Sequence, residues 1–196
     1  MPEHQSITAI ILAGGKSSRM KIDKGLVLFG RKPLVEQVID SVKEITDNII
    51  IITNNEAYLQ FGYSCFADEM KEKGPLGGIY TGLVNSSTQK NLVVGCDMPF
   101  LSLNIFRSLI DQCHGLDALL AEHKGKAEPL CAIYDRNCIP SLKILLEQGR
   151  LKITDALAGL KTSFISFDNK DWFKGYEFTN MNSPEDLLNF VKYEAS

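Results

Sequence analysis

A short segment near the N-terminus combines glycines, hydroxyls and cations in a way that suits phosphate binding. It reads LAGGKSSRMKIDKG, from Leu12 to Gly25, and directly follows an apolar run. Gly14 and Gly15 have no Cβ that would keep their backbone N–H groups away from an anion. Three cations in the same segment can neutralise that anion: Lys16, Arg19 and Lys24. The segment therefore predicts a phosphate-binding loop.

Two well-known glycine-rich nucleotide motifs do not describe this segment. Neither G-x-x-x-x-G-K-[ST] nor G-x-G-x-x-G occurs in it. A tight turn between a strand and a helix, with its charges in solvent, is the simpler alternative explanation for the same residues.

An aspartate follows a second apolar run in the middle of the chain. Asp97 lies in VVGCDMPF, just after residues 92–94. In a mainly parallel sheet, the carboxyl end of that run would lie beside the phosphate loop. Mg²⁺ binds one or two carboxylates together with phosphate and water oxygens. On its own Asp97 is better explained as a turn or capping residue before Pro99, but its combination with the loop favours a metal ligand.

Polar and glycine-rich positions also lie between these two segments. Asn54 and Asn55 follow the apolar run 49–52, and Asp68 precedes KGPLGGIYTGL at 73–83. The glycines of that stretch can let the backbone lie flat against a planar base. They also open a helix whose free N–H groups face a ligand. A simple chain reversal is the alternative reason for the glycines.

The last motif is N-M-N-S-P-E-D near the C-terminus. Helix capping explains residues 183–186, with Ser183 at the cap and proline in the first turn. Capping leaves Asn180 and Asn182 unexplained. Their spacing would point both side chains the same way from an extended segment, so both are candidate site residues.

Taken together, these motifs resemble a known family. L-A-G-G-x-S-x-R-M followed by D-K is similar to the signature of nucleotidyltransferases that activate sugars, polyols and pterins. Among these, the chain most resembles the molybdenum cofactor guanylyltransferases, which join GMP from GTP to molybdopterin. The resemblance runs in order from Leu12 to Leu187. One position departs from it, because Lys21 stands where the family commonly has glycine.

The resemblance implies a fold and a set of site residues. The fold would be α/β, a three-layer α/β/α Rossmann-like nucleotidyltransferase fold with a mainly parallel central sheet. The implied GTP-binding residues are Leu12, Ala13, Gly14, Gly15, Lys24, Asn54, Asp68, Gly74 and Asp97. Asn55 remains an alternative to Asn54 as the family-equivalent asparagine. The implied catalytic residues are Arg19, Lys24 and Asp97, and Asp97 would hold Mg²⁺.

Other segments resemble the parts of the family near the second substrate. Asn180 and Asn182 would close the site over the phosphates or the pterin, and Asn182 would reach the metal region. Pro129-Leu130 and Arg150 carry a weaker resemblance. Arg150 is more simply explained as a solvated cation at a helix end.

The reaction implied is attack of the molybdopterin terminal phosphate on the α-phosphorus of GTP, with release of pyrophosphate. A phosphate nucleophile is already ionised at neutral pH, so positioning and charge neutralisation suffice without a general base. Lys24 and Arg19 would offset charge on the triphosphate, and Mg²⁺ on Asp97 would aid the departure of pyrophosphate.

Three alternatives remain open. The first is a cytidylyltransferase acting on molybdopterin or another phosphorylated acceptor, which only the base-reading residues would distinguish. The second is a non-catalytic cofactor-binding protein of the same fold, which has little need for Lys24 and Asp97. The third is a glycosyltransferase, which usually shows a D-x-D motif after a strand, whereas residues 96–99 read CDMP.

The elements that must position these residues follow from hydrophobic patterns. An apolar run at 7–12, a helix opened by Pro33 and the run at 49–52 form a β-α-β unit. Residues 92–94 and a helix that Ser102 can cap repeat the pattern. Because the runs are fully apolar, the strands should be covered on both faces, as in a mainly parallel sheet.

The second half of the chain predicts a hairpin and further helices. The hairpin pairs 117–121 with 128–134 around Lys124-Gly125. Helices are expected near 137–146 and 153–160, and a last one from Ser183 should pack back on the sheet.

Composition limits the class of protein. The 196 residues contain no repeat or linker, which predicts one domain over 1–196. A net charge of −3 argues against a nucleic-acid partner. Short apolar stretches and a polar N-terminus predict neither a membrane span nor an export signal. We therefore expect a cytoplasmic monomer, whose protein partners would be transient ones that deliver molybdopterin or accept the product.

Cysteine and histidine usage adds two smaller expectations. The five cysteines include no C-x-x-C pair, so we expect reduced, mostly buried thiols. His114 and His123 have no partners at metal-ligand spacing, so we expect both at the surface.

Overall fold

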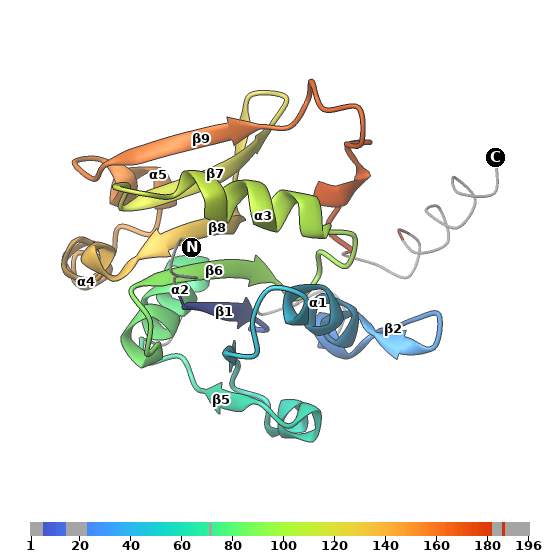
Figure 1. Ribbon diagram of the computed structural model, residues 1–196. Helices are drawn as coiled ribbons and strands as arrows, with labels where there is room; N and C mark the ends of the chain where they lie inside the picture. The colour runs from blue at the N-terminus through green and yellow to red at the C-terminus, as the bar shows by residue number, and fades with distance from the viewer. Residues whose placement is uncertain (1–5, 15–22, 71, 182–185, 187–196) are drawn as a thin grey trace.

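A seven-stranded sheet forms the centre of the molecule (Figure 1). The computed structural model describes residues 6–14, 23–70, 72–181 and 186. The strands occur in the order β5-β4-β1-β6-β8-β7-β9 across the sheet. They are β1 Ile7–Leu12, β4 Ile49–Ile52, β5 Ser64–Phe66, β6 Lys90–Gly95, β7 Ala118–His123, β8 Lys126–Asp135 and β9 Thr162–Ser166.

The sheet is mainly parallel. β8 pairs antiparallel with both β6 and β7, and the other pairs are parallel, so six strands share one direction. The arrows of β1, β6 and β9 in Figure 1 accordingly point to the same side. Leu12 lies opposite Ile52 on one neighbour and Gly95 on the other. The segments that follow these three strands therefore emerge together at one edge.

Helices connect the strands. The α-helices are α1 Leu34–Lys43, α2 Gly74–Asn85, α3 Leu103–Gln112, α4 Ile139–Glu147 and α5 Ile153–Leu157. Short 3₁₀ helices are η1 Lys24–Leu26, η2 Glu56–Phe61, η3 Arg136–Cys138 and η4 Tyr176–Phe178. A small two-stranded sheet, β2 Leu28–Phe29 and β3 Lys32–Pro33, precedes α1.

Two hydrophobic cores lie on the two faces of the sheet. Val38 of α1 and Phe106 of α3 pack with Ile11 on one face. Ile79 of α2 and Leu142 of α4 pack with Ile10 on the other. Successive residues of a strand point to opposite faces, so a strand buried on both sides is mostly apolar. The predicted three-layer α/β/α fold is confirmed.

Helix α2 approaches β1 closely at a glycine. A Cβ on Gly82 would lie 2.4 Å from Ile10 Cγ2, a distance that carbon atoms do not tolerate. The missing side chain lets α2 lie directly on the sheet. The helix thereby brings its first residue, Gly74, to the edge where β1 ends.

Three expectations about local structure need correction or comment. Ser102 does precede α3 as its N-cap residue, but its side chain makes no capping hydrogen bond and its buried Oγ has no partner. The helix expected over 153–160 ends at Leu157. The helix expected from Ser183 lies outside the described residues except for Asp186, which is helical. That residues 1–196 form one domain stays a prediction.

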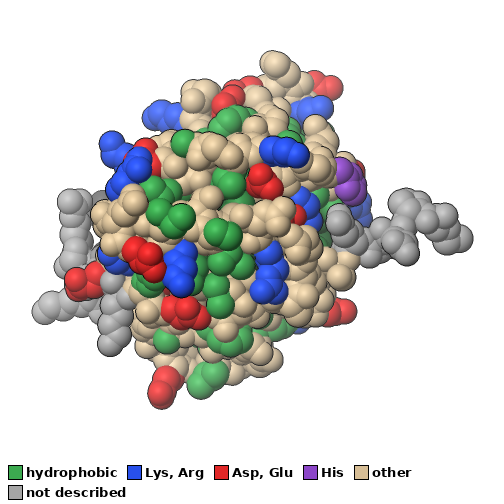
Figure 2. Space-filling model, turned by 90° about the vertical axis from the view of Figure 1, so that its left-hand side faces the viewer, with side chains coloured by type: hydrophobic (Ala, Val, Ile, Leu, Met, Phe, Trp, Pro, Cys, Tyr) green, Lys and Arg blue, Asp and Glu red, His purple; other side chains and the backbone are tan. Residues whose placement is uncertain are grey.

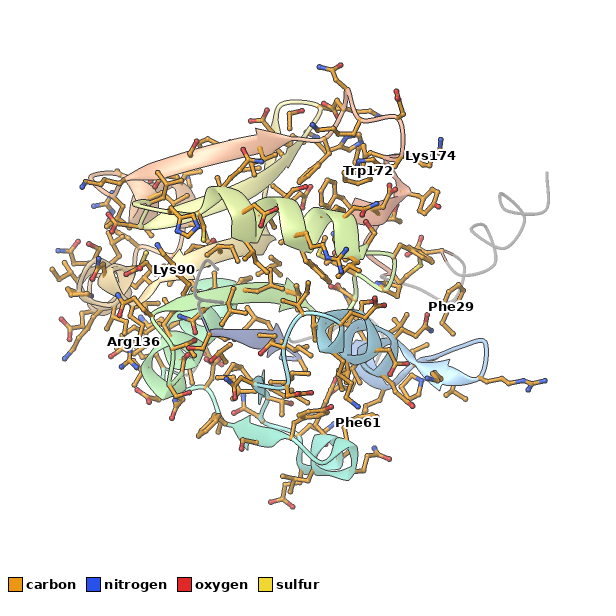
Figure 3. All side chains as sticks on the ribbon, in the orientation of Figure 1. Phe29, Phe61, Lys90, Arg136, Trp172 and Lys174 are labelled. Atoms are coloured by element: carbon orange, nitrogen blue, oxygen red, sulfur yellow. The ribbon has the colours of Figure 1, made fainter. Side chains whose placement is uncertain are left out.

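The surface opposite the site edge carries mixed charge. Figure 2 shows this face, where Lys and Arg side chains are interspersed with Asp and Glu. Lys90 and Arg136 lie toward the same end of the sheet in Figure 3. No described helix has the length and the apolar character needed to cross a bilayer. All five cysteines are free and four are buried, with Cys65 partly exposed.

Candidate functional site

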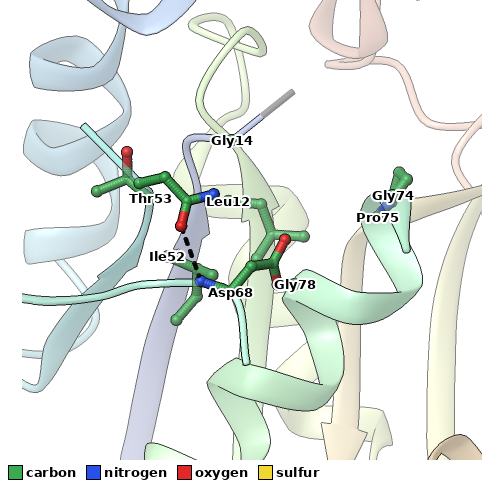
Figure 4. Close-up of a pocket in the computed structure, with 9 residues that line it drawn as sticks. Leu12, Gly14, Ile52, Thr53, Asp68, Gly74, Pro75 and Gly78 are labelled. Carbon is green, nitrogen blue, oxygen red and sulfur yellow. Dashed lines mark hydrogen bonds between the residues drawn. The ribbon is translucent and has the colours of Figure 1, made fainter. Parts of the chain in front are cut away.

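A pocket opens at the edge where β1 and β4 end and α2 begins (Figure 4). It contains five of the predicted GTP-binding residues, from four separate segments of the chain. The residues that line it are Leu12, Gly14, Ile52, Thr53, Asn54, Asp68, Gly74, Pro75 and Gly78. Gly14 continues directly from the buried strand, and a parallel sheet places ligands at this carboxyl edge.

Two polar side chains of the pocket are held by hydrogen bonds. The Oδ1 atom of Asn54 accepts a hydrogen bond from the backbone N–H of Asp68 at 3.2 Å, drawn as a dashed line in Figure 4. The buried Thr81 hydroxyl donates to Asp68 Oδ1 at 3.3 Å and accepts from the N–H of Glu69 at 3.1 Å. Burial raises the pKa of Asp68, and the Thr81 hydrogen bond opposes that shift.

The two asparagines that the sequence left as alternatives have different environments. Asn54 lines the pocket. Asn55 instead caps η2, because its Oδ1 accepts from the N–H of Ala57 at 3.0 Å, and its Nδ2 donates to Asp23 Oδ2 at 3.0 Å. Asn54 is therefore the asparagine available to a ligand in this pocket.

Lys24 and Asp97 form an ion pair next to the pocket. Lys24 Nζ lies 3.8 Å from Asp97 Oδ2. The N–H of Cys96 donates to the carbonyl of Leu12 at 3.1 Å, which fixes the segment after β6 against the segment after β1. Burial raises the pKa of Asp97, and the nearby ammonium of Lys24 partly offsets that rise.

Gly95 leaves space for the Asp97 carboxylate. A Cβ at Gly95 would lie 3.0 Å from Asp97 Oδ1 and 3.5 Å from Leu130 Cδ1. The absence of a side chain at the last residue of β6 therefore permits the observed position of the carboxylate. It also brings Leu130 of β8, one of the weaker second-substrate candidates, close to the site.

Asp97 suits a magnesium site in which the substrate and water supply the remaining ligands. The Asp97 side chain is 19% exposed, so one carboxylate is accessible just after β6, the strand that pairs with β1. Among the described residues, no three His, Cys, Asp or Glu side chains cluster as metal ligands. Mg²⁺ commonly takes one or two carboxylates and completes its shell with phosphate oxygens and water. The chemistry of Asp97 suits that arrangement rather than a cage built by the protein alone.

The C-terminal segment reaches the same place. The N–H of Met181 donates to the carbonyl oxygen of Asp97 at 2.8 Å. Met181 is buried against Leu34, which anchors the segment. Asn180, which is exposed, is thereby held next to the Asp97 backbone.

Not every predicted residue falls within the described structure. Gly15, Arg19 and Asn182 lie outside the described residues. Ala13 is buried in the core beneath α1, so only its backbone faces the edge. Its N–H donates to the carbonyl of Ile52 at 2.9 Å.

Other predicted positions lie farther from the pocket. Arg150 is exposed and pairs with Asp155 at 3.0 Å, as a solvated helix-end cation would. His114 is exposed as expected. His123 is partly exposed, because its ring, which is 19% exposed, lies 2.5 Å from Asp168 Oδ1 and packs edge-on against Phe173. Its neighbours Trp172 and Lys174 are labelled in Figure 3.

Sequence reasoning missed the residues that support the site. Asp23 and Tyr58 contact each other beside Lys24, Asn55 supports Asp23 although it was considered only as a possible GTP ligand, and Thr81 holds Asp68. The aspartate of the D-K pair was a usable signal for the first group. Contacts to Tyr58 and Thr81 depend on the fold, and no local pattern indicates them.

Known proteins are similar to this chain along most of its length. Residues 9–161 match the profile of the MobA-like NTP transferase domain. A protein of Flavobacterium johnsoniae named "Probable molybdenum cofactor guanylyltransferase" is 37% identical over 93% of this chain and 95% of its own length. A molybdenum cofactor guanylyltransferase of Vibrio campbellii is 34% identical over 95% of each chain.

A solved structure shares the fold. Molybdopterin-guanine dinucleotide biosynthesis protein A of Archaeoglobus fulgidus superimposes with a TM-score of 0.80 at 24% identity, over 96% of this chain and 98% of its own. The profile match covers residues 9–161, and the two relatives cover more than nine-tenths of the chain. The chain belongs to the family of MobA-like NTP transferase domains.

Proposed function

We propose that this protein transfers GMP from GTP to molybdopterin with release of pyrophosphate, forming the guanine dinucleotide form of the molybdenum cofactor. The observation that carries the proposal is the Lys24–Asp97 pair beside a pocket lined by Gly14, Asn54 and Asp68. The names of relatives that align along nearly the whole chain support the same activity.

The bond changes need no protein base. An oxygen of the molybdopterin phosphate forms a bond to the α-phosphorus of GTP, and the bond from that phosphorus to the oxygen bridging to the β-phosphate breaks. That oxygen leaves with pyrophosphate, and the attacking oxygen is already ionised at neutral pH. The protein's part is to align the two phosphates and to neutralise their charge.

Lys24 supplies a cation for the triphosphate. Its ammonium is held near Asp97 and is 30% exposed, so it can turn toward an anion at the pocket edge. Arg19 would add a second cation from the preceding loop. Mg²⁺ held by Asp97 would supply further charge neutralisation on the phosphates and on the leaving pyrophosphate.

Asp68 is the candidate for reading the base. The Watson–Crick edge of guanine carries two adjacent donors, N1–H and N2–H₂, which match the two oxygens of a carboxylate. Cytosine presents one donor beside the N3 acceptor, and a carboxylate repels that acceptor. The position of Asp68 beside Gly74 and Pro75, where a planar base can lie against the backbone, therefore favours GTP over CTP.

A substitution at Asp97 tests the proposal. Asp97→Asn should lower Mg²⁺-dependent turnover of GTP with molybdopterin by on the order of 100-fold or more. Near-normal, Mg²⁺-dependent turnover of this variant would contradict the assignment of Asp97. A cytoplasmic location, a monomeric state and transient contacts with cofactor-handling proteins remain predictions.

A further inference from the structure

A buried tyrosine reaches from η2 to the segment that carries Lys24. The Tyr58 side chain is completely buried, and its hydroxyl lies 2.5 Å from Asp23 Oδ1. Buried tyrosine hydroxyls need a hydrogen-bond partner, and a carboxylate acceptor gives a short, strong bond. Burial also raises the pKa of Tyr58, so this hydroxyl stays protonated and donates. Phe61, labelled in Figure 3, marks the end of the same 3₁₀ helix.

Asn55 holds the other oxygen of the same carboxylate. Its Nδ2 donates to Asp23 Oδ2 at 3.0 Å. The orientation of this amide is fixed because its Oδ1 accepts from the N–H of Ala57. The N–H of Gly25 is a third donor to this carboxylate and lies 3.3 Å from Asp23 Oδ1. Both oxygens of Asp23 are therefore engaged by donors from the protein, which argues against a role as a metal ligand.

Gly25 makes this contact possible. A Cβ at Gly25 would lie 2.3 Å from the Tyr58 hydroxyl oxygen and 3.1 Å from Cys96 Sγ. Gly25 is buried and does not adopt a positive φ. Close packing, rather than an unusual backbone conformation, thus requires glycine here. Gly25 therefore packs against both Tyr58 and Cys96, the residue before Asp97.

Lys24 lies between the two residues that this contact fixes. Asp23 precedes it and caps η1, and Gly25 follows it. A lysine side chain has about 2 kcal/mol of rotamer entropy to lose, so a fixed backbone on both sides limits where its ammonium can go. Lys24 consequently points to Asp97, which follows Cys96. A preorganised cation stabilises developing charge better than one that must reorganise.

We infer that Tyr58 and Asn55 are positioning residues for the transfer reaction, acting through Asp23 to place the ammonium of Lys24 at the triphosphate. The inference rests on the proposed guanylyl transfer. It assigns a functional reason to three side chains that do not line the nucleotide pocket.

The test is a double-mutant cycle on kcat/KM for GTP. Tyr58→Phe removes only the hydroxyl and should lower kcat/KM about tenfold. Lys24→Met should lower it on the order of 100-fold or more. If Tyr58 acts through Lys24, adding Tyr58→Phe to Lys24→Met should cause less than about a twofold further loss. If Tyr58 had only a structural role, Tyr58→Phe would lower kcat/KM by the same factor in the wild type and in Lys24→Met. That result would overturn the inference.

A matched control and a second variant keep the test decisive. Tyr134→Phe removes another buried hydroxyl, which donates to the carbonyl of Pro129 at 3.1 Å, and should not show coupling to Lys24→Met. If Tyr58→Phe does not fold, Asn55→Ser removes the amide donor to Asp23 but keeps a good capping residue for η2. It should repeat the coupled loss, and an uncoupled loss would overturn the inference.

Failure of the proposed function would look different. If folded wild-type protein released no pyrophosphate from GTP with molybdopterin, guanylyl transfer would be wrong and the inference would fall with it. If the wild type were active and the losses from Tyr58→Phe and Lys24→Met multiplied, only the positioning role would be wrong.

Discussion

Lys24 Nζ and Asp97 Oδ2 lie 3.8 Å apart and join the two segments that leave β1 and β6. The contact has an electrostatic consequence, because the ammonium opposes the rise that burial causes in the pKa of Asp97. It also gives the site adjacent groups of opposite charge, one suited to phosphate and the other to a divalent cation.

Removal of the Lys24 charge should reduce the rate without unfolding the protein. Lys24→Met keeps most of the aliphatic stem, which is partly buried. We expect kcat/KM for GTP to fall on the order of 100-fold or more, measured by pyrophosphate release at saturating molybdopterin. Lys32→Met is the matched control, since Lys32 pairs with Asp40 on the exposed side of α1. Equal activity of the two variants would contradict a role for Lys24.

Asp97→Asn should make the ligand-free protein more stable near neutral pH. Burial raises the folded-state pKa of Asp97 above its ordinary value of 3.8, so this group costs folding free energy as the pH rises above its ordinary pKa, and the cost is complete once the pH exceeds the folded pKa. Asparagine carries no such cost. The melting temperature of the variant, measured with chelator and without nucleotide, should exceed that of the wild type at pH 7, and the difference should disappear as the pH falls below about 4.

Asp168→Asn provides a control of opposite sign. The hydrogen bond from His123 lowers the pKa of Asp168. A lowered folded-state pKa contributes stability above the ordinary pKa, and that contribution is lost as the pH falls through the folded value. At pH 6 the melting temperature of Asp168→Asn should therefore be lower than that of the wild type, and this difference should disappear in strong acid. Stabilisation by this variant, or destabilisation by Asp97→Asn at pH 7, would contradict the respective pKa direction.

Two glycine substitutions should have different effects, one mainly on the reaction rate and the other mainly on the stability of the protein. Gly95→Ala places a Cβ 3.0 Å from Asp97 Oδ1 and should lower kcat about tenfold by displacing the carboxylate, with little change in melting temperature. Gly82→Ala places a Cβ 2.4 Å from Ile10 Cγ2 and should cost about 1–3 kcal/mol of unfolding free energy. Ile10→Ala should recover part of that loss in the double variant. A reversed pattern, with Gly95→Ala unstable but fully active when folded, would refute the role of Gly95.

The base assignment can be tested with inosine triphosphate. ITP lacks the N2 amino group of GTP, so a carboxylate that reads both donors should prefer GTP by roughly 10- to 100-fold in kcat/KM. Asp68→Asn should remove most of that preference. Thr81→Val should weaken it to a smaller extent, because it removes the hydroxyl that holds Asp68. Glu69→Gln makes the same change of charge at an exposed neighbour and should leave the preference intact. An unchanged GTP/ITP ratio in Asp68→Asn would exclude Asp68 as the reader of N2.

The sequence predicted the layers of the fold and the meeting of the main site residues. Mostly apolar runs such as 7–12 and 49–52 indicate strands buried on both faces. Because parallel strands end at the same edge of a sheet, Asp97 is then expected near the segment that follows residues 7–12 and contains Lys24. These are consequences of local pattern and general topology, so one sequence suffices to predict them.

The supporting contacts could not be predicted, because they join segments that only the fold brings together. Tyr58 contacts Asp23, which lies 35 positions earlier in the sequence. Which of Asn54 and Asn55 lines the pocket and which caps η2 depends on where that helix begins. The contact between His123 and Asp168 joins residues 45 positions apart, and no local signal indicates it. Ser102 has the residue type of a cap but not the side-chain geometry.

The most direct test of the account is a pyrophosphate-release assay with molybdopterin and Mg²⁺, run in parallel with GTP, CTP, ATP and UTP. If the protein is a guanylyltransferase, pyrophosphate should be released with GTP, and little should be released with the other three nucleotides. Release with CTP alone would keep the fold and the chemistry but contradict the assignment of Asp68 and of the guanine base. If protein shown to be folded released no pyrophosphate with any of the four nucleotides, that result would contradict nucleotidyl transfer to molybdopterin.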